Sequence, residues 1–113
     1  MEVIIYQGTQ YADKVRYRGG KPFDEPPYVV LYSPSTKKFF GVDTTPTEGA
    51  EENTSYDFEF EPALTALMPP GTYHLEIYAD NTREVMLQRN DCYVEVRKAA
   101  SSPDSIQPSQ QNS

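Results

Sequence analysis

The residue types that catalyse reactions or bind metal ions are scarce in this chain. It has one histidine, His74, and one cysteine, Cys92, so it cannot form an internal disulfide. A zinc site needs three or four histidine or cysteine ligands, which these two residues cannot supply. A Ser-His-Asp or Cys-His arrangement would have to use His74, which lies on the polar side of an alternating segment. We therefore interpret His74 as a surface histidine, and Cys92 as a small residue in or near the core.

Carboxylates are abundant, but their spacing matches no motif that we can identify. Asp43, Glu48, Glu51 and Glu52 fall in a polar stretch without periodicity and lack the alternating Asp/Asn-Gly-Glu pattern of a calcium loop. A glycosidase pair would need a cleft, whereas the carboxylates fall in predicted loops and on the outer side of predicted strands. The residues therefore predict no enzymatic activity, no cofactor and no metal site.

The charge balance argues against nucleic acid or a membrane as the partner. The chain has ten Lys and Arg against 17 Asp and Glu, a formal net charge of −7. A nucleic-acid groove needs clustered basic residues, and the longest basic run is Lys37-Lys38. An acidic surface disfavours anionic membranes, and no apolar stretch has the length of a membrane span. No signal peptide is apparent, so we expect use without Sec export, or release by lysis.

Alternating apolar and polar residues predict an all-β fold. A chain of 113 residues suits one domain with one core. We expect a single antiparallel β-sandwich of seven or eight strands over residues 1–98, and it should be immunoglobulin-like because Tyr73 follows Gly71 at the start of a strand. The polar residues 99–113 are expected to form a disordered tail, or an arm that becomes ordered on a partner. The predicted strands span residues 2–7, 11–18, 28–32, 37–42, 56–60, 72–79 and 83–97, the last with a bulge or bend at Arg89-Asn90-Asp91.

The alternation also predicts which strand residues face the core. Between residues 72 and 79 the inward set is Tyr73, Leu75 and Ile77, and the outward set is Thr72, His74, Glu76 and Tyr78. Near the C-terminal end the inward residues are Val85, Leu87, Cys92, Val94 and Val96, with Tyr93 outside.

The stretch from Tyr56 to Ala79 predicts a corner between the two sheets. After the first strand, Leu64, Leu67 and Met68 would share one face of a short helical turn and cover the end of the sandwich. Gly71 then precedes Tyr73, where immunoglobulin-like domains often place a tyrosine whose phenol bonds back to upstream backbone. Leu67, Gly71 and Tyr73 are therefore the predicted structural residues of the corner.

Aromatic residues are the best candidates for contacts with a partner. The chain has nine tyrosines and five phenylalanines but no tryptophan. Phe39 and Phe40 are adjacent in a predicted strand and must point to opposite faces, so one of them should be exposed. The tyrosines either cover the sheet faces, half-buried, or form an interface, and the sequence leaves both interpretations open. The candidate contact residues are Phe23, Tyr28, Phe39, Phe40, Tyr78 and Tyr93.

The order of these features resembles the small immunoglobulin-like domains of tailed-bacteriophage virions. The opening resembles the N-terminal domain of baseplate upper proteins, in Gln7-Gly8-Thr9 and Gly20-Lys21-Pro22-Phe23-Asp24. The later part resembles the strand, Thr-x-x-Leu turn, Pro-Gly-x-Tyr corner and final strand of the same domains. The matching residues there are Phe58, Phe60, Thr65, Leu67, Pro70, Gly71, Tyr73, Val94 and Val96.

The resemblance implies a non-enzymatic structural protein of a phage particle. Because the polar tail follows the domain directly, the chain is most similar to capsid auxiliary or decoration proteins. These are oligomeric within the particle and bind other virion proteins, above all the major capsid protein. The implied location is the virion, assembled in the cytoplasm of the host bacterium. A baseplate or tail component is the alternative within this class, and a stand-alone bacterial sugar- or peptide-binding module is the alternative outside it.

Overall fold

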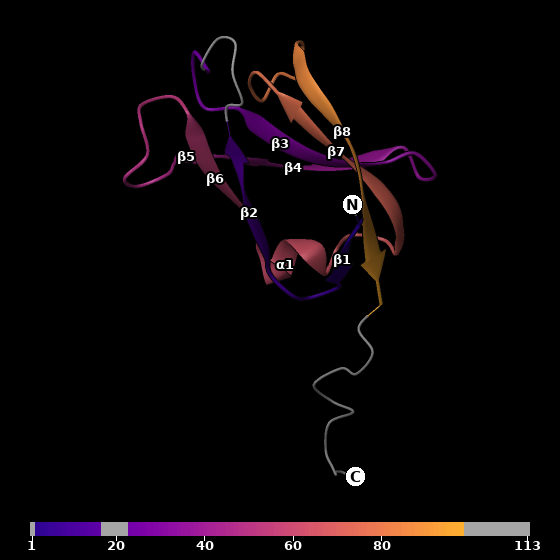
Figure 1. Ribbon diagram of the computed structural model, residues 1–113. Coiled ribbons are helices and arrows are strands. Elements are labelled where there is room, and N and C mark those ends of the chain that lie inside the picture. The colour runs from indigo at the N-terminus through magenta and orange to yellow at the C-terminus, as the bar shows by residue number, and fades with distance from the viewer. Residues whose placement is uncertain (1, 17–22, 99–113) are drawn as a thin grey trace, which may run out of the picture.

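The protein folds as an all-β sandwich of two sheets, shown in Figure 1. The computed structural model describes residues 2–16 and 23–98, with only the backbone of Glu2 and residues 89–92. The larger sheet has the order β1-β8-β7-β3-β4, and the smaller one has the order β2-β6-β5. The larger sheet contains β1 (Glu2–Tyr6), β8 (Met86–Arg97), β7 (Gly71–Tyr78), β3 (Tyr28–Ser33) and β4 (Lys38–Asp43). The smaller sheet contains β2 (Tyr11–Arg16), β6 (Ser55–Phe60) and β5 (Thr45–Pro46).

This arrangement confirms the predicted immunoglobulin-like sandwich and corrects the direction of one strand pair. β1 pairs with β8 in parallel, whereas all other pairs in the described chain are antiparallel. The first strand therefore joins the sheet of the last strand, and the chain crosses to the smaller sheet between Tyr6 and Tyr11. The last predicted strand, residues 83–97, forms β8 from Met86 onward, and its pairing with β7 shifts register between His74 and Glu76, which confirms the predicted bulge. The polar stretch after Asp43, predicted as a loop, contains the short β5.

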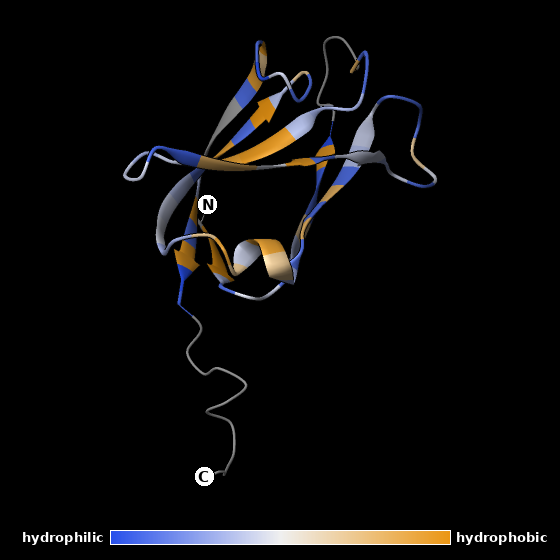
Figure 2. Cartoon of the chain, turned by 180° about the vertical axis from the view of Figure 1, so that it is seen from behind, coloured by the Kyte–Doolittle hydropathy of each residue, from blue (hydrophilic) through white to orange (hydrophobic). Residues whose placement is uncertain are grey.

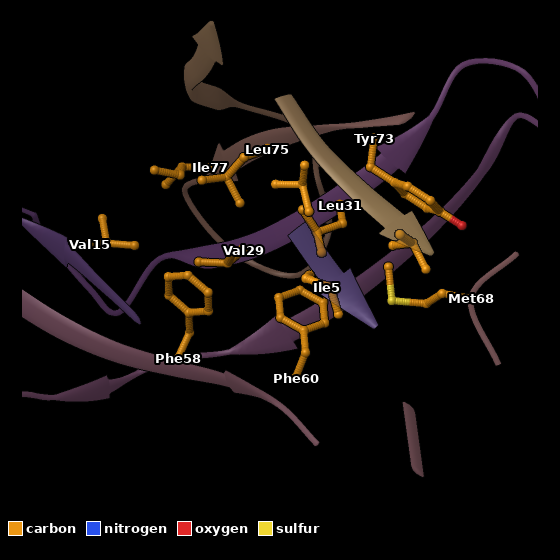
Figure 3. Close-up of a cluster of buried hydrophobic side chains, with 12 residues drawn as sticks. Ile5, Val15, Val29, Leu31, Phe58, Phe60, Met68, Tyr73, Leu75 and Ile77 are labelled. Carbon is orange, nitrogen blue, oxygen red and sulfur yellow. The ribbon is translucent and has the colours of Figure 1, made fainter. Parts of the chain in front are cut away.

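The core lies between the sheets and follows the predicted alternation. Val29 and Leu31 of β3 are fully buried and face Phe58 and Phe60 of β6, as Figure 3 shows. Figure 2 shows apolar residues concentrated in the strands and in α1 (Pro62–Thr65), and polar residues in the loops. The predicted inward residues Tyr73, Leu75, Ile77, Val94 and Val96 are all buried. Burial of these side chains is the main favourable contribution to folding.

The predicted corner between β6 and β7 is confirmed for two of its three residues. Tyr73 is buried, and its phenol donates a hydrogen bond to the carbonyl oxygen of Pro69 over 2.6 Å. Gly71 has a φ of +145°, which residues with a Cβ rarely adopt. Leu67, however, is 71% exposed, because α1 ends at Thr65 and Leu67 no longer lies on its inward face. Met68 takes the buried position instead.

Two predictions about the β7–β8 hairpin are wrong. Val85 and Leu87 are 57% and 47% exposed, and among the described side chains of β8 only Val94 and Val96 belong to the core. Glu76 and Tyr78, predicted to face solvent, are buried on the outer side of the larger sheet. Neighbouring side chains on that outer face cover Glu76 and Tyr78. Alternation predicts which face of the sheet a residue lies on, but not whether its neighbours on that face bury it.

Several predictions concern residues outside the described part of the chain. They are the disordered tail at 99–113, the inward position of the Cys92 side chain, and the Gly20-Lys21-Pro22 part of the resemblance to baseplate proteins.

Candidate functional site

The outer face of the larger sheet carries a row of aromatic rings from four neighbouring strands. Phe39 of β4 lies opposite Tyr32 of β3, Tyr32 lies opposite His74 of β7, and His74 lies opposite Tyr93 of β8. The rings of His74 and Tyr93 are 5.2 Å apart between centroids. Residues in register on one face are in contact distance across antiparallel strands. We call Phe39, Tyr32, His74 and Tyr93 the aromatic row.

The two ends of the aromatic row are the parts most open to solvent. Phe39 is 40% exposed and Tyr93 is 52% exposed. On the β1 side, the same face continues with Ile4 and Tyr6, which are 41% and 40% exposed. Large apolar side chains that remain exposed together on one face are typical of a surface that binds another molecule.

Arg83 places a positive charge on the aromatic row. Its guanidinium lies 3.6 Å from the centroid of the Phe39 ring, a cation–π contact. Arg83 comes from the connection between β7 and β8, which a hydrogen bond from Ala79 N to Val85 O closes over 2.9 Å. The row thus combines apolar rings with one cation at its β4 end.

A packed layer next to the aromatic row, in which Tyr78 is buried and Tyr28 half-buried, holds the outer face in place. Tyr28 lies opposite Tyr78 in the β3–β7 pair, and the phenol of Tyr78 donates a hydrogen bond to Glu76 Oε1 over 2.7 Å. The ring of Tyr28 occupies the space that a Cβ on Gly41 would need. Burial raises the pKa of both phenols, of Tyr78 further through its hydrogen bond to Glu76. Tyr78, a predicted contact residue, is therefore buried support for the face.

The structure divides the six predicted contact residues between the outer face of the larger sheet and the interior of the sandwich. Tyr28, Phe39, Tyr78 and Tyr93 belong to the outer face. Phe40 and Phe23 face inward and pack against the core, at centroid distances of 6.4 Å from Tyr73 and 5.5 Å from Tyr56 respectively. Tyr32, His74 and Arg83 were missed, because their place in the row follows from strand order and register.

A second feature is an open hollow of about 750 Å³ where the smaller sheet meets β4. Val42, Phe58 and Leu64 contribute its apolar part. Five carboxylates and one lysine contribute its polar part: Asp13, Asp43, Asp57, Glu59, Glu61 and Lys14. Carboxylates that the sequence placed in loops and on strand exteriors thus surround one concave surface.

The lysine of this hollow forms an ion pair with one of its carboxylates. Lys14 Nζ lies 2.7 Å from Asp57 Oδ1, and the hydroxyl of Thr47 donates to the same carboxylate over 2.7 Å. The hydrogen bond from Lys14, followed by that from Thr47, holds the pKa of Asp57 below its ordinary value.

Within the described residues, no three His, Cys, Asp or Glu side chains are grouped so as to hold a metal ion. In the same part of the chain, no helix is long and apolar enough to span a membrane.

The fold and this surface define an immunoglobulin-like β-sandwich with an exposed aromatic sheet face. No protein-family model and no curated protein matches the chain. Among solved structures, it is similar to a putative glycoside hydrolase from Bacteroides vulgatus ATCC 8482, with a TM-score of 0.52 and 15% identity over 88% of this chain. The chain spans only 17% of the length of that protein. At this identity the likeness supports the shared fold alone.

Proposed function

We propose that this chain is a non-catalytic docking domain, which binds a protein partner through the outer face of the larger sheet. The aromatic row is the observation that carries this proposal. Its members come from four adjacent strands and lie in register, and the two end rings remain 40% and 52% exposed. Tyrosine and phenylalanine are enriched at the centres of protein interfaces, together with arginine, which Arg83 supplies here.

The construction of the face favours binding with little loss of entropy. Tyr28, Glu76 and Tyr78 form a packed layer beside the row, and the strands themselves hold the ring positions. Aromatic side chains have few rotatable bonds, so ordering them on a partner costs little. Covering Phe39 and Tyr93 would contribute on the order of 1–3 kcal/mol each, the size expected for interface anchors.

We place this docking domain in a tailed-phage particle, as a capsid auxiliary or decoration protein bound to the major capsid protein. The support is the sequence resemblance in the Pro-Gly-x-Tyr corner at Pro70-Gly71-Thr72-Tyr73 and in the turn before it, where Thr65-Ala66-Leu67 is one residue shorter than Thr-x-x-Leu. In this role the protein acts by covering surface between neighbouring subunits, so many copies bind to one shell. A baseplate or tail component would use the same face in far fewer copies.

Mass spectrometry of purified phage particles tests the virion role. We expect the chain in the particles, in hundreds of copies for a capsid protein and in a handful for a tail component. Phe39→Ala and Tyr93→Ala should lower incorporation, while the control Leu67→Ala, at a 71% exposed position away from the outer face, should not. Absence of the chain from the particles would overturn the virion role, and unchanged incorporation of both variants would overturn docking by this face.

The hollow favours one second candidate, a binding module for a small ligand or peptide. It is concave, with apolar residues beside several carboxylates, and the fold also occurs as part of the Bacteroides vulgatus protein. Glycan and peptide arrays test this candidate. A hit that Glu61→Gln and Glu59→Gln weaken, and that Phe39→Ala does not, would favour ligand binding in the hollow over docking by the aromatic row.

A further inference from the structure

In the described part of the chain four strands lie at sheet edges, and β1 has the fewest features that discourage pairing with another chain. β5 has two residues, one of them Pro46. β2 contains Asp13, Lys14 and Arg16, and β4 begins with Lys38 and ends with Asp43. In β1, by contrast, the one charge is Glu2 at its start, whereas β4 has a charge at each end, and β1 pairs with β8 without a bulge or a proline. Natural proteins usually protect edge strands with charges, prolines or bulges.

The backbone of β1 presents a defined set of hydrogen-bonding groups at this edge. Gln7 N donates to Arg97 O of β8 over 2.9 Å, so the odd-numbered residues point their N–H groups toward β8. Backbone groups alternate in direction along a strand, so the N–H and C=O of Ile4 point away from the sheet. The Tyr6 carbonyl accepts from Thr9 N over 3.1 Å and from Thr9 Oγ1 over 2.6 Å. Both of its lone pairs are therefore occupied.

We propose that β1 pairs with β1 of a second copy of this chain, antiparallel about a two-fold axis at Ile4. Ile4 then lies opposite Ile4 of the second copy, and the two exchange both backbone hydrogen bonds. The Tyr6 N–H of each copy also donates a hydrogen bond to the Glu2 carbonyl of the other copy. The two five-stranded sheets become one sheet of ten strands. This pairing goes beyond the docking role proposed above and does not depend on it.

The register follows from the groups available. When the two-fold axis lies at Ile4, three pairs of residues point their backbone groups at each other. Residue 4 faces residue 4 of the second copy, residue 2 faces residue 6, and residue 6 faces residue 2. A shift of two residues in either direction leaves only two such pairs. A shift toward Tyr6 would also set its occupied carbonyl against the partner. The same register brings the exposed side chain of Ile4 against its symmetry mate on the outer face.

Charge and size make this a weak dimer whose strength depends on salt. Each copy has a formal net charge of −7, so the copies repel at low ionic strength, and added salt screens this repulsion. A single five-residue edge is small beside the roughly 1,200 Å² that stable specific interfaces bury. We expect dimers at high protein concentration and, above all, where many copies are held close together.

Sedimentation equilibrium of the purified full chain tests the pairing. We expect the average mass to rise from 12.8 kDa toward twice that value with concentration, and more readily in high salt. Ile4→Pro removes the outward N–H but none of the bonds to β8, and should weaken dimerisation about tenfold or more. Ile4→Thr keeps the backbone donor and should still dimerise. Melting temperatures establish that both variants fold.

Disulfide trapping tests the register. In a Cys92→Ser background, Ile4→Cys places two thiols across the two-fold axis, where a disulfide should form under mild oxidation. Val3→Cys is the control, because residue 3 lies opposite residue 5 of the second copy and should not cross-link. A monomer at all concentrations would overturn the proposal, as would a dimer unaffected by Ile4→Pro or equal cross-linking at positions 3 and 4. Failure of the docking role would appear instead in the Phe39 and Tyr93 variants and would leave this dimer unchanged.

Discussion

The phenol of Tyr73 donates a hydrogen bond to the carbonyl oxygen of Pro69, four residues earlier in the chain, over 2.6 Å. The ring itself is fully buried in the core, 6.4 Å from the ring of Phe40. Gly71, with its φ of +145°, lets the chain turn between these two residues. One side chain thus ties the connection after α1 to the core and sets the start of β7, the strand at the centre of the larger sheet.

Tyr73→Phe should reduce the free energy of unfolding by about 1–2 kcal/mol. It keeps the buried ring and removes one hydrogen bond, leaving the Pro69 carbonyl without this donor. Urea denaturation measures the difference. Tyr32→Phe, the same change on the outer face, is the control and should stay within about 0.5 kcal/mol of wild type. An equal decrease in the free energy of unfolding in both variants would show that the hydrogen bond from Tyr73 to Pro69 contributes no additional stability.

Stability should fall as the pH rises above about 10, where an ordinary tyrosine ionises. Burial raises the pKa of Tyr28, Tyr73 and Tyr78 in the folded state. The folded chain therefore holds these protons more tightly than the unfolded chain. Their contribution is fully present below the unfolded pKa and is lost as the pH rises through the folded values. Melting temperatures between pH 8 and 11 test this, and Tyr73→Phe should show a shallower decline than wild type.

The neighbours Phe39 and Phe40 should separate partner binding from stability. Phe40→Ala removes a ring that packs against the core beside Tyr73, and should cost about 2–4 kcal/mol. Phe39→Ala removes a 40% exposed ring on the outer face and should cost about 1 kcal/mol or less. Urea denaturation compares the two variants, and incorporation into particles shows whether Phe39 contributes to binding. A large loss of stability in Phe39→Ala would contradict its assignment to the docking face.

Thr65→Val should destabilise the link between α1 and the first crossing of the chain. The Thr65 hydroxyl donates to the carbonyl of Thr9 over 2.7 Å and accepts from Gly8 N over 3.1 Å. Thr65 is fully buried, so the isosteric change leaves two backbone groups without this partner, at a cost of about 1–3 kcal/mol. The control is Thr54→Val, which removes a solvent-exposed bond to Glu51 and should change little. Thermal unfolding of both variants distinguishes the two outcomes.

Much of the fold was predictable because its signals are local. Strict alternation in β6 and β7 identified the core residues Phe58, Phe60, Tyr73 and Leu75, and Pro-Pro-Gly before Tyr73 identified the corner. The exposed Leu67 was predicted wrongly, since one missing helical turn changes which side a residue faces. The exposed Val85 and Leu87 were also predicted wrongly, because no second layer covers that part of the hairpin.

By itself, then, the sequence determined the class of fold, the inward face of most strands and the tyrosine corner. Period-two alternation and turn residues act over a few neighbouring positions, so they can be recognised without knowing what the strands pair with. The tertiary structure decided the candidate functional surface. Phe39, Tyr32, His74 and Tyr93 form one row only because β4, β3, β7 and β8 lie side by side in a particular register. Strand order and register come from packing between segments distant in sequence, and no local pattern encodes them.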